Sequence, residues 1–254
     1  MESSSRSAVV DAGPEIDTRT LALSALHAAA CGEPRQMTVL LAEVERTACG
    51  PGHALDRALA RLARAIVLAL DGHAEAADAE LTEALHGAAR ERVDPGRLMA
   101  AIRELGDVVI VTGTGRRWLA SSSTLAFPAG AVVLDARSDE LMVRGEPRSL
   151  RRYPVRRRLL YALAHHPGSL LGKDALVEAV WGGAYDPLRH DDLIKVSVCH
   201  LRRVLAGSGL AVVCGHPGYR LDVVEPFMFV SAFELGRAGS PRLTAASLSA
   251  IDRR

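Results

Sequence analysis

Aromatic residues and lysine are scarce in this sequence. Phe, Trp and Tyr together make up 4% of the 254 residues, and lysine occurs only at Lys173 and Lys195. Arginine therefore carries most of the positive charge, which we attribute to genome composition and not to function. Hydrophobic residues still make up 48% of the chain, which excludes wholesale disorder. A chain of this length has room for two modest domains.

Sequence signals for metal binding, export and membrane insertion are also missing. The cysteines Cys31, Cys49, Cys199 and Cys214 form no C-x-x-C pair, so we expect reduced thiols, no metal and no cofactor. The N-terminus lacks the basic and apolar segments of a signal peptide. No apolar run approaches the ~20 residues of a membrane helix. We expect a soluble cytoplasmic protein with no membrane partner.

No catalytic signature is present either. Thr112-Gly113-Thr114-Gly115 follows a predicted strand but lacks the Gly-Lys-Ser/Thr ending of a phosphate-binding loop. The pair His165-His166 has no third ligand at metal-binding spacing. Neither Gly-x-Ser-x-Gly nor His-Glu-x-x-His occurs. We therefore predict that the protein is not an enzyme.

The near-neutral charge hides an asymmetry between the two halves of the chain. Residues 1–111 hold 11 Arg against 17 Asp plus Glu, a net charge of −6. Residues 144–221 hold 13 Arg plus Lys against 6 acids, a net charge of +7. This distribution predicts that only the basic half meets a polyanion.

The N-terminal half has helical periodicity. We expect a flexible tail over residues 1–15 and a helical input or dimerisation domain over residues 16–106. The Ala-rich segment 58–85 has the two helices and the Gly turn of a single tetratricopeptide repeat, and a plain helical bundle explains it equally well. Asp94 and Pro95 predict the N-cap and first position of the last helix.

The pattern changes to short β-branched runs after residue 107. These runs predict an antiparallel sheet, with strands at residues 108–111, 116–120, 131–134, 140–144 and 148–150. Residues 154–221 then follow the order helix, helix, helix, hairpin, which is the outline of a winged helix. An apolar patch opens the C-terminal tail predicted for residues 225–254, and it either packs on the N-terminal helices or mediates dimerisation.

Several motifs in residues 108–224 make this region similar to the C-terminal effector domain of OmpR/PhoB-type regulators. The resembling residues are Leu159, Leu160 and Leu163, His166-Pro167-Gly168, Leu170 to Leu176, Val180-Trp181-Gly182, Val196 to Val198, Leu201 to Leu205, and Gly218-Tyr219-Arg220-Leu221. The resemblance implies a winged-helix domain over residues 107–224 that opens with an antiparallel sheet. Together with the all-α bundle that the helical periodicity predicts, this gives an α+β fold.

Two features depart from that family. Regulators of this type usually carry a receiver domain upstream, whereas residues 1–106 contain no lysine and no alternating strands. The middle of the recognition helix often carries several arginines, and here Cys199 and His200 take those positions. The input signal and the reading face therefore differ from the family pattern.

DNA contacts are predicted from the face opposite the apolar stripe of Ile194, Val198, Leu201 and Leu205. The predicted DNA-binding residues are Lys195, Ser197, Cys199, His200, Arg202 and Arg203 on the third helix, and His216, Tyr219 and Arg220 on the wing. Arg152, Arg156 and Arg157 are predicted phosphate contacts. Asp191 and Asp192 are expected to cap the third helix and to face away from phosphate. Tyr219 either contacts DNA or packs on the core.

These observations predict a DNA-binding transcriptional regulator with its third helix in the major groove. Its partners would be double-stranded DNA, a second copy of the chain and the transcription machinery. The alternative is a degenerate winged helix that binds proteins and not DNA, which the Cys199-His200 pair and the modest basic surplus favour.

Overall fold

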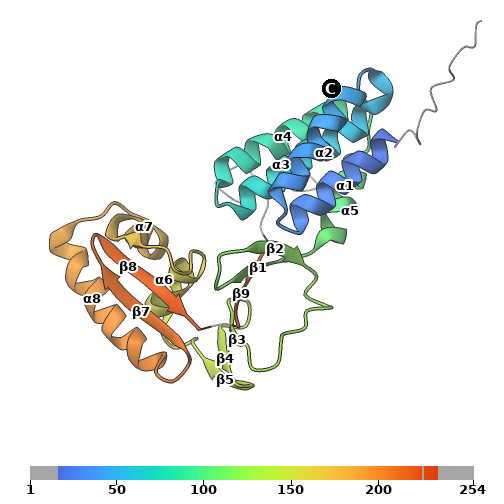
Figure 1. The fold of residues 1–254 in the computed structure, drawn as a ribbon. Helices are drawn as coiled ribbons and strands as arrows, with labels where there is room; N and C mark the ends of the chain where they lie inside the picture. The colour runs from blue at the N-terminus through green and yellow to red at the C-terminus, as the bar shows by residue number, and fades with distance from the viewer. Residues whose placement is uncertain (1–16, 225, 234–254) are drawn as a thin grey trace, which may run out of the picture.

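A computed structural model describes residues 17–224 and 226–233. Figure 1 shows a helical bundle and a winged helix, with a β-sheet between them. The bundle contains α1 (Thr18–Ala30), α2 (Pro34–Thr47), α3 (Ala54–Leu70), α4 (Ala74–Arg90) and α5 (Pro95–Leu105), with a 3-10 turn at Pro51–His53. The predicted cap of α5 is confirmed, because the Asp94 carboxylate accepts a hydrogen bond of 2.8 Å from the backbone N–H of Gly96.

Small side chains allow the helices of the bundle to approach closely. Ala22, Ala25 and Ala29 of α1 and Ala63 of α3 are fully buried where these helices pack. Helices α3 and α4 form the antiparallel hairpin that the Ala-rich segment predicts, and they turn at Asp71 and Gly72. Helices α1 and α2 pack against each other in the same core.

A six-stranded sheet follows the bundle. Its strands are β1 (Val108–Thr112), β2 (Arg117–Ala120), β3 (Val132–Asp135), β4 (Glu140–Val143), β5 (Glu146–Ser149) and β9 (Phe227–Ala232), in the order β2-β1-β9-β3-β4-β5. Strand β9 pairs antiparallel with β1 and parallel with β3. The sheet is therefore mixed and not purely antiparallel as predicted.

The position of β9 corrects the prediction of a C-terminal tail from residue 225. Residues 227–232 form an inner strand of the sheet, and Phe227, Phe229 and Val230 are fully buried in it. The apolar run that suggested an interaction patch is a strand buried on both faces, which local sequence does not distinguish from an exposed patch. The rest of the predicted tail, residues 234–254, lies outside the described residues.

The winged helix lies between β5 and β9 in the chain. It contains α6 (Pro154–Ala164), β6 (Leu171–Gly172), α7 (Lys173–Trp181), α8 (Pro187–Val204), β7 (Leu210–Gly215) and β8 (Gly218–Val223). The three strands form a second sheet in the order β6-β8-β7. Gly218 is required there, because a Cβ atom at this position would lie 1.7 Å from the carbonyl oxygen of Leu171.

The winged helix and the six-stranded sheet share one apolar core. Leu160, Leu176 and Ile194 from the three helices are buried in the same cluster as Leu134 and Phe229 of the sheet. The packing of one face of the sheet against the winged helix explains why β9 must return to the sheet after the wing. At the other end of the sheet, Leu119 of β2 joins the core of the helical bundle.

Candidate nucleic-acid interface

Helix α8 has the two faces that a recognition helix needs. Ile194, Val198, Leu201 and Leu205 are all at most 2% exposed, so the predicted apolar stripe is confirmed. Lys195, Cys199, Arg202 and Arg203 are exposed, and Ser197 and His200 are half-buried. The buried stripe fixes α8 on the domain, and its polar face is open to a partner.

The helix begins earlier than the sequence analysis expected. Its N-cap is Asp186, whose carboxylate accepts a hydrogen bond of 3.0 Å from the backbone N–H of Leu188. The expectation that Asp191 and Asp192 lie at the start of the helix is therefore wrong, since both lie in its second turn. Pro187 at the first helical position was the signal that could have located this start.

Only one of these two aspartates faces away from the exposed face. Asp191 accepts a hydrogen bond of 2.8 Å from the Lys173 ammonium and another from the Tyr185 hydroxyl, and these bonds lower the pKa of its carboxyl. The Asp192 side chain is 91% exposed and lies 3.5 Å from Lys195. Asp192 thus partly offsets the charge of Lys195 on the exposed face.

Sequence reasoning missed the exposed apolar residues of α8. Leu188 is 98% exposed, Val196 is 54% exposed and Leu193 is 46% exposed. Val196 lies one turn before Cys199 and His200 and two turns before Arg203, so it belongs to the centre of the exposed face. Apolar contact with the methyl group of thymine is one use for such a side chain in a major groove.

Arg202 lies beside the wing. Its Nε–H donates a hydrogen bond of 2.8 Å to the carbonyl oxygen of Val212 in β7. Arg203 is exposed and makes no hydrogen bond or ion pair to any described residue. Of the two adjacent arginines, Arg203 is therefore the one with a free guanidinium, while Arg202 connects α8 to β7.

His200 faces α6 and its basic cluster. The Arg156 guanidinium donates a hydrogen bond of 2.9 Å to His200 Nδ1 and stacks over the Tyr153 ring at 4.3 Å from its centroid. Since Nδ1 accepts a hydrogen bond from the guanidinium, the ring carries its own proton on Nε2. Arg156 and His200 thus form one polar site that joins the start of α6 to α8.

The predicted phosphate contacts Arg152 and Arg157 have different environments. Arg152 is exposed. Arg157 forms an ion pair with Asp139, which also accepts a hydrogen bond of 3.0 Å from the Tyr161 hydroxyl. Burial and the neighbouring carboxylate raise the pKa of Tyr161. The ion pair of Arg157 with Asp139 holds α6 against the six-stranded sheet, so this guanidinium is not free for a phosphate.

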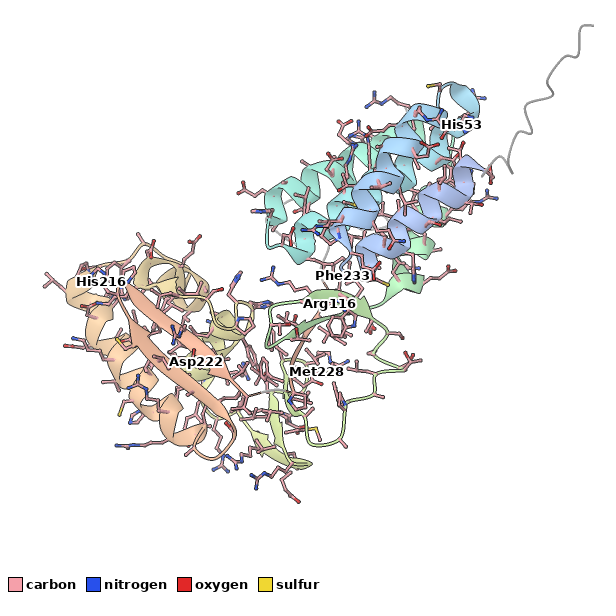
Figure 2. The ribbon with its side chains drawn as sticks, in the orientation of Figure 1. His53, Arg116, His216, Asp222, Met228 and Phe233 are labelled. Atoms are coloured by element: carbon pink, nitrogen blue, oxygen red, sulfur yellow. The ribbon has the colours of Figure 1, made fainter. Side chains whose placement is uncertain are left out.

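The wing presents two of its three predicted contact residues. His216 is exposed at the tip of the β7–β8 hairpin, as Figure 2 shows, and Arg220 pairs with Asp222 at 2.7 Å. Tyr219 is only 6% exposed and belongs to the core cluster of the winged helix. Of the two alternatives for Tyr219, packing on the core is the one found, and DNA contact is not, because its place in the alternation along β8 puts the ring inside.

This arrangement of three helices and a hairpin, with an open polar face on the third helix, defines a winged-helix domain. Residues 148–221 match the family model described as "Transcriptional regulatory protein, C terminal". Over these residues the predicted resemblance to the effector domain of OmpR/PhoB-type regulators is confirmed. A comparison with curated proteins finds no match.

The described part of the N-terminal half is not a receiver domain. Residues 18–105 form helices without the alternating strands that a receiver contains. Among residues 17–224 and 226–233, no three His, Cys, Asp or Glu side chains gather in a metal-binding arrangement. No helix in that part of the chain is long and apolar enough to cross a bilayer.

Proposed function

We propose that the protein regulates transcription by inserting α8 into the major groove of DNA. The observation that carries the proposal is the match of residues 148–221 to a regulatory effector domain whose third helix has an open, basic face. Arg203 and Lys195 supply positive charge on that face, and Val196 and Cys199 lie between them. Arginine can bind guanine edges through two hydrogen bonds, and lysine contacts bases or phosphates with less specificity.

Backbone contacts would come from both sides of α8. Arg156 with His200 and the exposed Arg152 flank the helix on the side of α6. His216 and Arg220 flank it on the side of the wing, where they would meet the minor groove or the phosphates. Such contacts fix the register of the helix, while the residues on the α8 face read the sequence.

The helical bundle would supply the input. We assign to residues 16–106 the reception of a signal, dimerisation or both, and to residues 107–224 together with β9 the DNA-binding function. Contact with the transcription machinery and a cytoplasmic location follow from the same proposal. The net negative charge of the N-terminal half supports this division, because acidic surfaces are repelled by DNA.

A second function is favoured by the apolar residues of α8. Leu188, Leu193 and Val196 expose hydrophobic surface on the helix that would face DNA. Exposed apolar side chains that lie together on one face favour a protein partner. The rival function is therefore a winged helix that binds another protein and has lost DNA binding.

Retardation of random duplex DNA in gels at two salt concentrations separates these functions. Neutralised phosphates release counterions, so a DNA reader loses about 10³-fold or more in affinity between roughly 50 and 200 mM salt. Salt-dependent retardation supports the regulator, and no retardation at the lower salt concentration supports the protein-binding alternative. Arg203→Ala weakens retardation only if α8 lies on the DNA.

A further inference from the structure

A cavity of about 590 Å³ lies where the helical bundle, the six-stranded sheet and the winged helix meet. Leu70 of α3, Val109 of β1, Ala162 of α6, Ala179 of α7 and Phe233 after β9 contribute to its wall. Its size falls in the range of small-molecule sites, and its wall is mostly apolar. Its lining residues come both from the helical bundle, the proposed input domain, and from the proposed DNA-binding domain.

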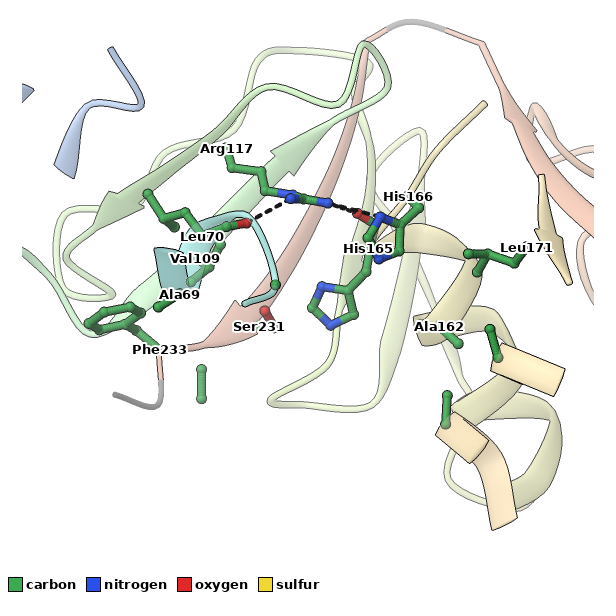
Figure 3. Close-up of a pocket in the computed structure, with 14 residues that line it drawn as sticks. Ala69, Leu70, Val109, Arg117, Ala162, His165, His166, Leu171, Ser231 and Phe233 are labelled. Atoms are coloured by element: carbon green, nitrogen blue, oxygen red, sulfur yellow. Dashed lines mark hydrogen bonds between the residues drawn. The ribbon is translucent and has the colours of Figure 1, made fainter. Parts of the chain in front are cut away.

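One arginine spans the cavity. Arg117 donates hydrogen bonds of 2.7 Å to the carbonyl oxygens of Leu70 and His165, and its Nη2 lies 3.1 Å from His166 Nδ1. Figure 3 shows the guanidinium between the end of α3 and the two histidines. A guanidinium has five N–H donors, so two of them remain for another acceptor.

Arg117 has no anionic partner within reach. Among the described residues, no carboxylate lies within ion-pair distance of Arg117. The Asp71 carboxylate, outside the wall of this cavity, stabilises the Arg117 charge only from farther away. Loss of hydration lowers the pKa of the Arg117 guanidinium. A partly desolvated cation whose nearest carboxylate lies beyond ion-pair distance is stabilised further when a ligand supplies negative charge.

The other polar groups of the wall carry no charge at neutral pH. Loss of hydration, followed by the charges of His166 and Arg117, lowers the pKa of His165 to about 4. The pKa of His166 is lowered by loss of hydration and by Arg117. Two neutral imidazoles and the Ser231 hydroxyl can therefore form hydrogen bonds beside a single positive charge.

We propose that this cavity binds a small organic monocarboxylate, whose carboxylate pairs with Arg117 and whose apolar body lies against Val109, Ala162 and Phe233. One cation matches a singly charged head group better than a phosphate ester, which carries nearly two charges. The Nε–H and the second Nη1–H of Arg117 remain free and point in different directions, so the carboxylate would accept one charge-assisted hydrogen bond from the guanidinium. The ligand would touch both halves of the chain, so it is suited to be the signal that the bundle passes to the winged helix.

Calorimetric titration of the full chain with hexanoate and benzoate tests the site without DNA. Failure of this proposal is therefore distinguishable from failure of the proposed function. Both carboxylates are expected to bind, and hexanamide and benzamide to bind at least about tenfold more weakly, because the neutral amides lose the charge-assisted pair. Binding of neither carboxylate, or equal binding of the amides, overturns the proposal.

Two pairs of variants locate the binding. Arg117→Gln removes the cation and is expected to weaken hexanoate binding by about tenfold or more, whereas Arg116→Gln, at the exposed neighbouring arginine, leaves it unchanged. Ala179→Trp adds bulk at an exposed position of the cavity wall and is expected to weaken binding, whereas Glu178→Trp, at a neighbouring exposed position outside the wall, is not.

If Arg117 only connects the ends of α3 and α6, Arg117→Gln lowers thermal stability, and hexanoate binds neither the wild type nor the variants. Should Arg117→Gln fail to fold, the Ala179→Trp and Glu178→Trp pair and the amide comparison still decide the question. Hexanoate binding that survives both Arg117→Gln and Ala179→Trp contradicts the assignment to this cavity.

Discussion

The Nε–H of Arg202 donates a hydrogen bond to the carbonyl oxygen of Val212, 2.8 Å away, and this bond joins the recognition helix to the wing. The neighbouring Arg203 has no such bond. Two adjacent arginines in one sequence motif therefore have different environments: Arg202 is bonded to the wing, and Arg203 is free for the proposed contact with a partner. Helical geometry explains the difference, because adjacent residues point about 100° apart around the helix axis.

Single substitutions of these arginines should separate the two roles. Arg202→Ala is expected to lower the free energy of unfolding by about 1 kcal/mol, because Val212 loses a charge-assisted hydrogen bond. Arg203→Ala should change it by less than about 0.5 kcal/mol and reduce the slope of log K against log salt by about 1. Urea unfolding and fluorescence anisotropy on duplex DNA measure these effects. Equal losses of stability in both variants would contradict the assignment.

Val196 offers a test of the exposed face of α8. Val196→Glu places a negative charge at the centre of this face and is expected to reduce DNA affinity by about tenfold or more through repulsion of the phosphates. Val39→Glu on α2 is the matched control, since Val39 is 71% exposed and belongs to the helical bundle. Anisotropy titrations of both variants check this. Similar affinities for the two variants would remove α8 from the interface.

Strand β9 makes the region after the wing essential to the fold. Phe229 is fully buried, with its ring 5.7 Å from that of Tyr161 and 4.7 Å from that of His165. Phe229→Ala should lower the free energy of unfolding by about 3–5 kcal/mol, because it leaves a cavity in the shared core. Val224→Ala, at a position 64% exposed, is expected to have little effect. Chemical denaturation measures both, and a loss below 1 kcal/mol for Phe229→Ala, roughly that of a surface residue, argues against β9 in the core.

His165 makes stability depend on pH. Its pKa is about 4 in the folded protein and roughly 6.5 in the unfolded chain. Below the unfolded value the unfolded chain binds a proton that the folded chain does not, so stability falls as the pH drops from 6.5 toward 4. His165 is itself solvent-exposed, so water reduces the effect of its lowered pKa on stability. We therefore expect His165→Gln to remove on the order of 1 kcal/mol or less of the loss between pH 7 and pH 5.

The control for this titration is His73→Gln in the bundle, where the side chain is exposed. Urea midpoints of the wild type and both variants at pH 7 and pH 5 provide the measurement. If the loss of stability between these two pH values is the same for the wild type and His165→Gln, His165 does not have the lowered pKa that its surroundings indicate.

Much of the fold follows from local sequence patterns. The α3–α4 hairpin follows from the Ala-rich segment and its Gly turn, and the start of α5 follows from Asp94 and Pro95. The buried stripe of α8 follows from the spacing of Ile194, Val198, Leu201 and Leu205. Local patterns could not predict β9, because its neighbours β1 and β3 are separated from it by about 90 residues or more of chain. Pairing over such distances depends on tertiary packing, to which strand propensity gives little guidance.

The candidate interface was predictable in outline and not in detail. The family motifs identify α8 and the wing, and residue type identifies the basic side chains. Whether a given arginine is free depends on its partners, as the pairing of Arg157 with Asp139 illustrates. The inward orientation of Tyr219 depends on the register of β8 with β6 and β7, which only the folded sheet defines.

The central claim is that α8 reads bases in the major groove. The most direct measurement is to select genomic fragments bound by the full chain and then to map guanine N7 methylation interference on the selected site, since N7 lies in the major groove. The account predicts interference over one short run of base pairs, and loss of selection with Val196→Glu but not with Val39→Glu. Recovery of no enriched fragment, or binding that N7 methylation leaves unchanged, would contradict it.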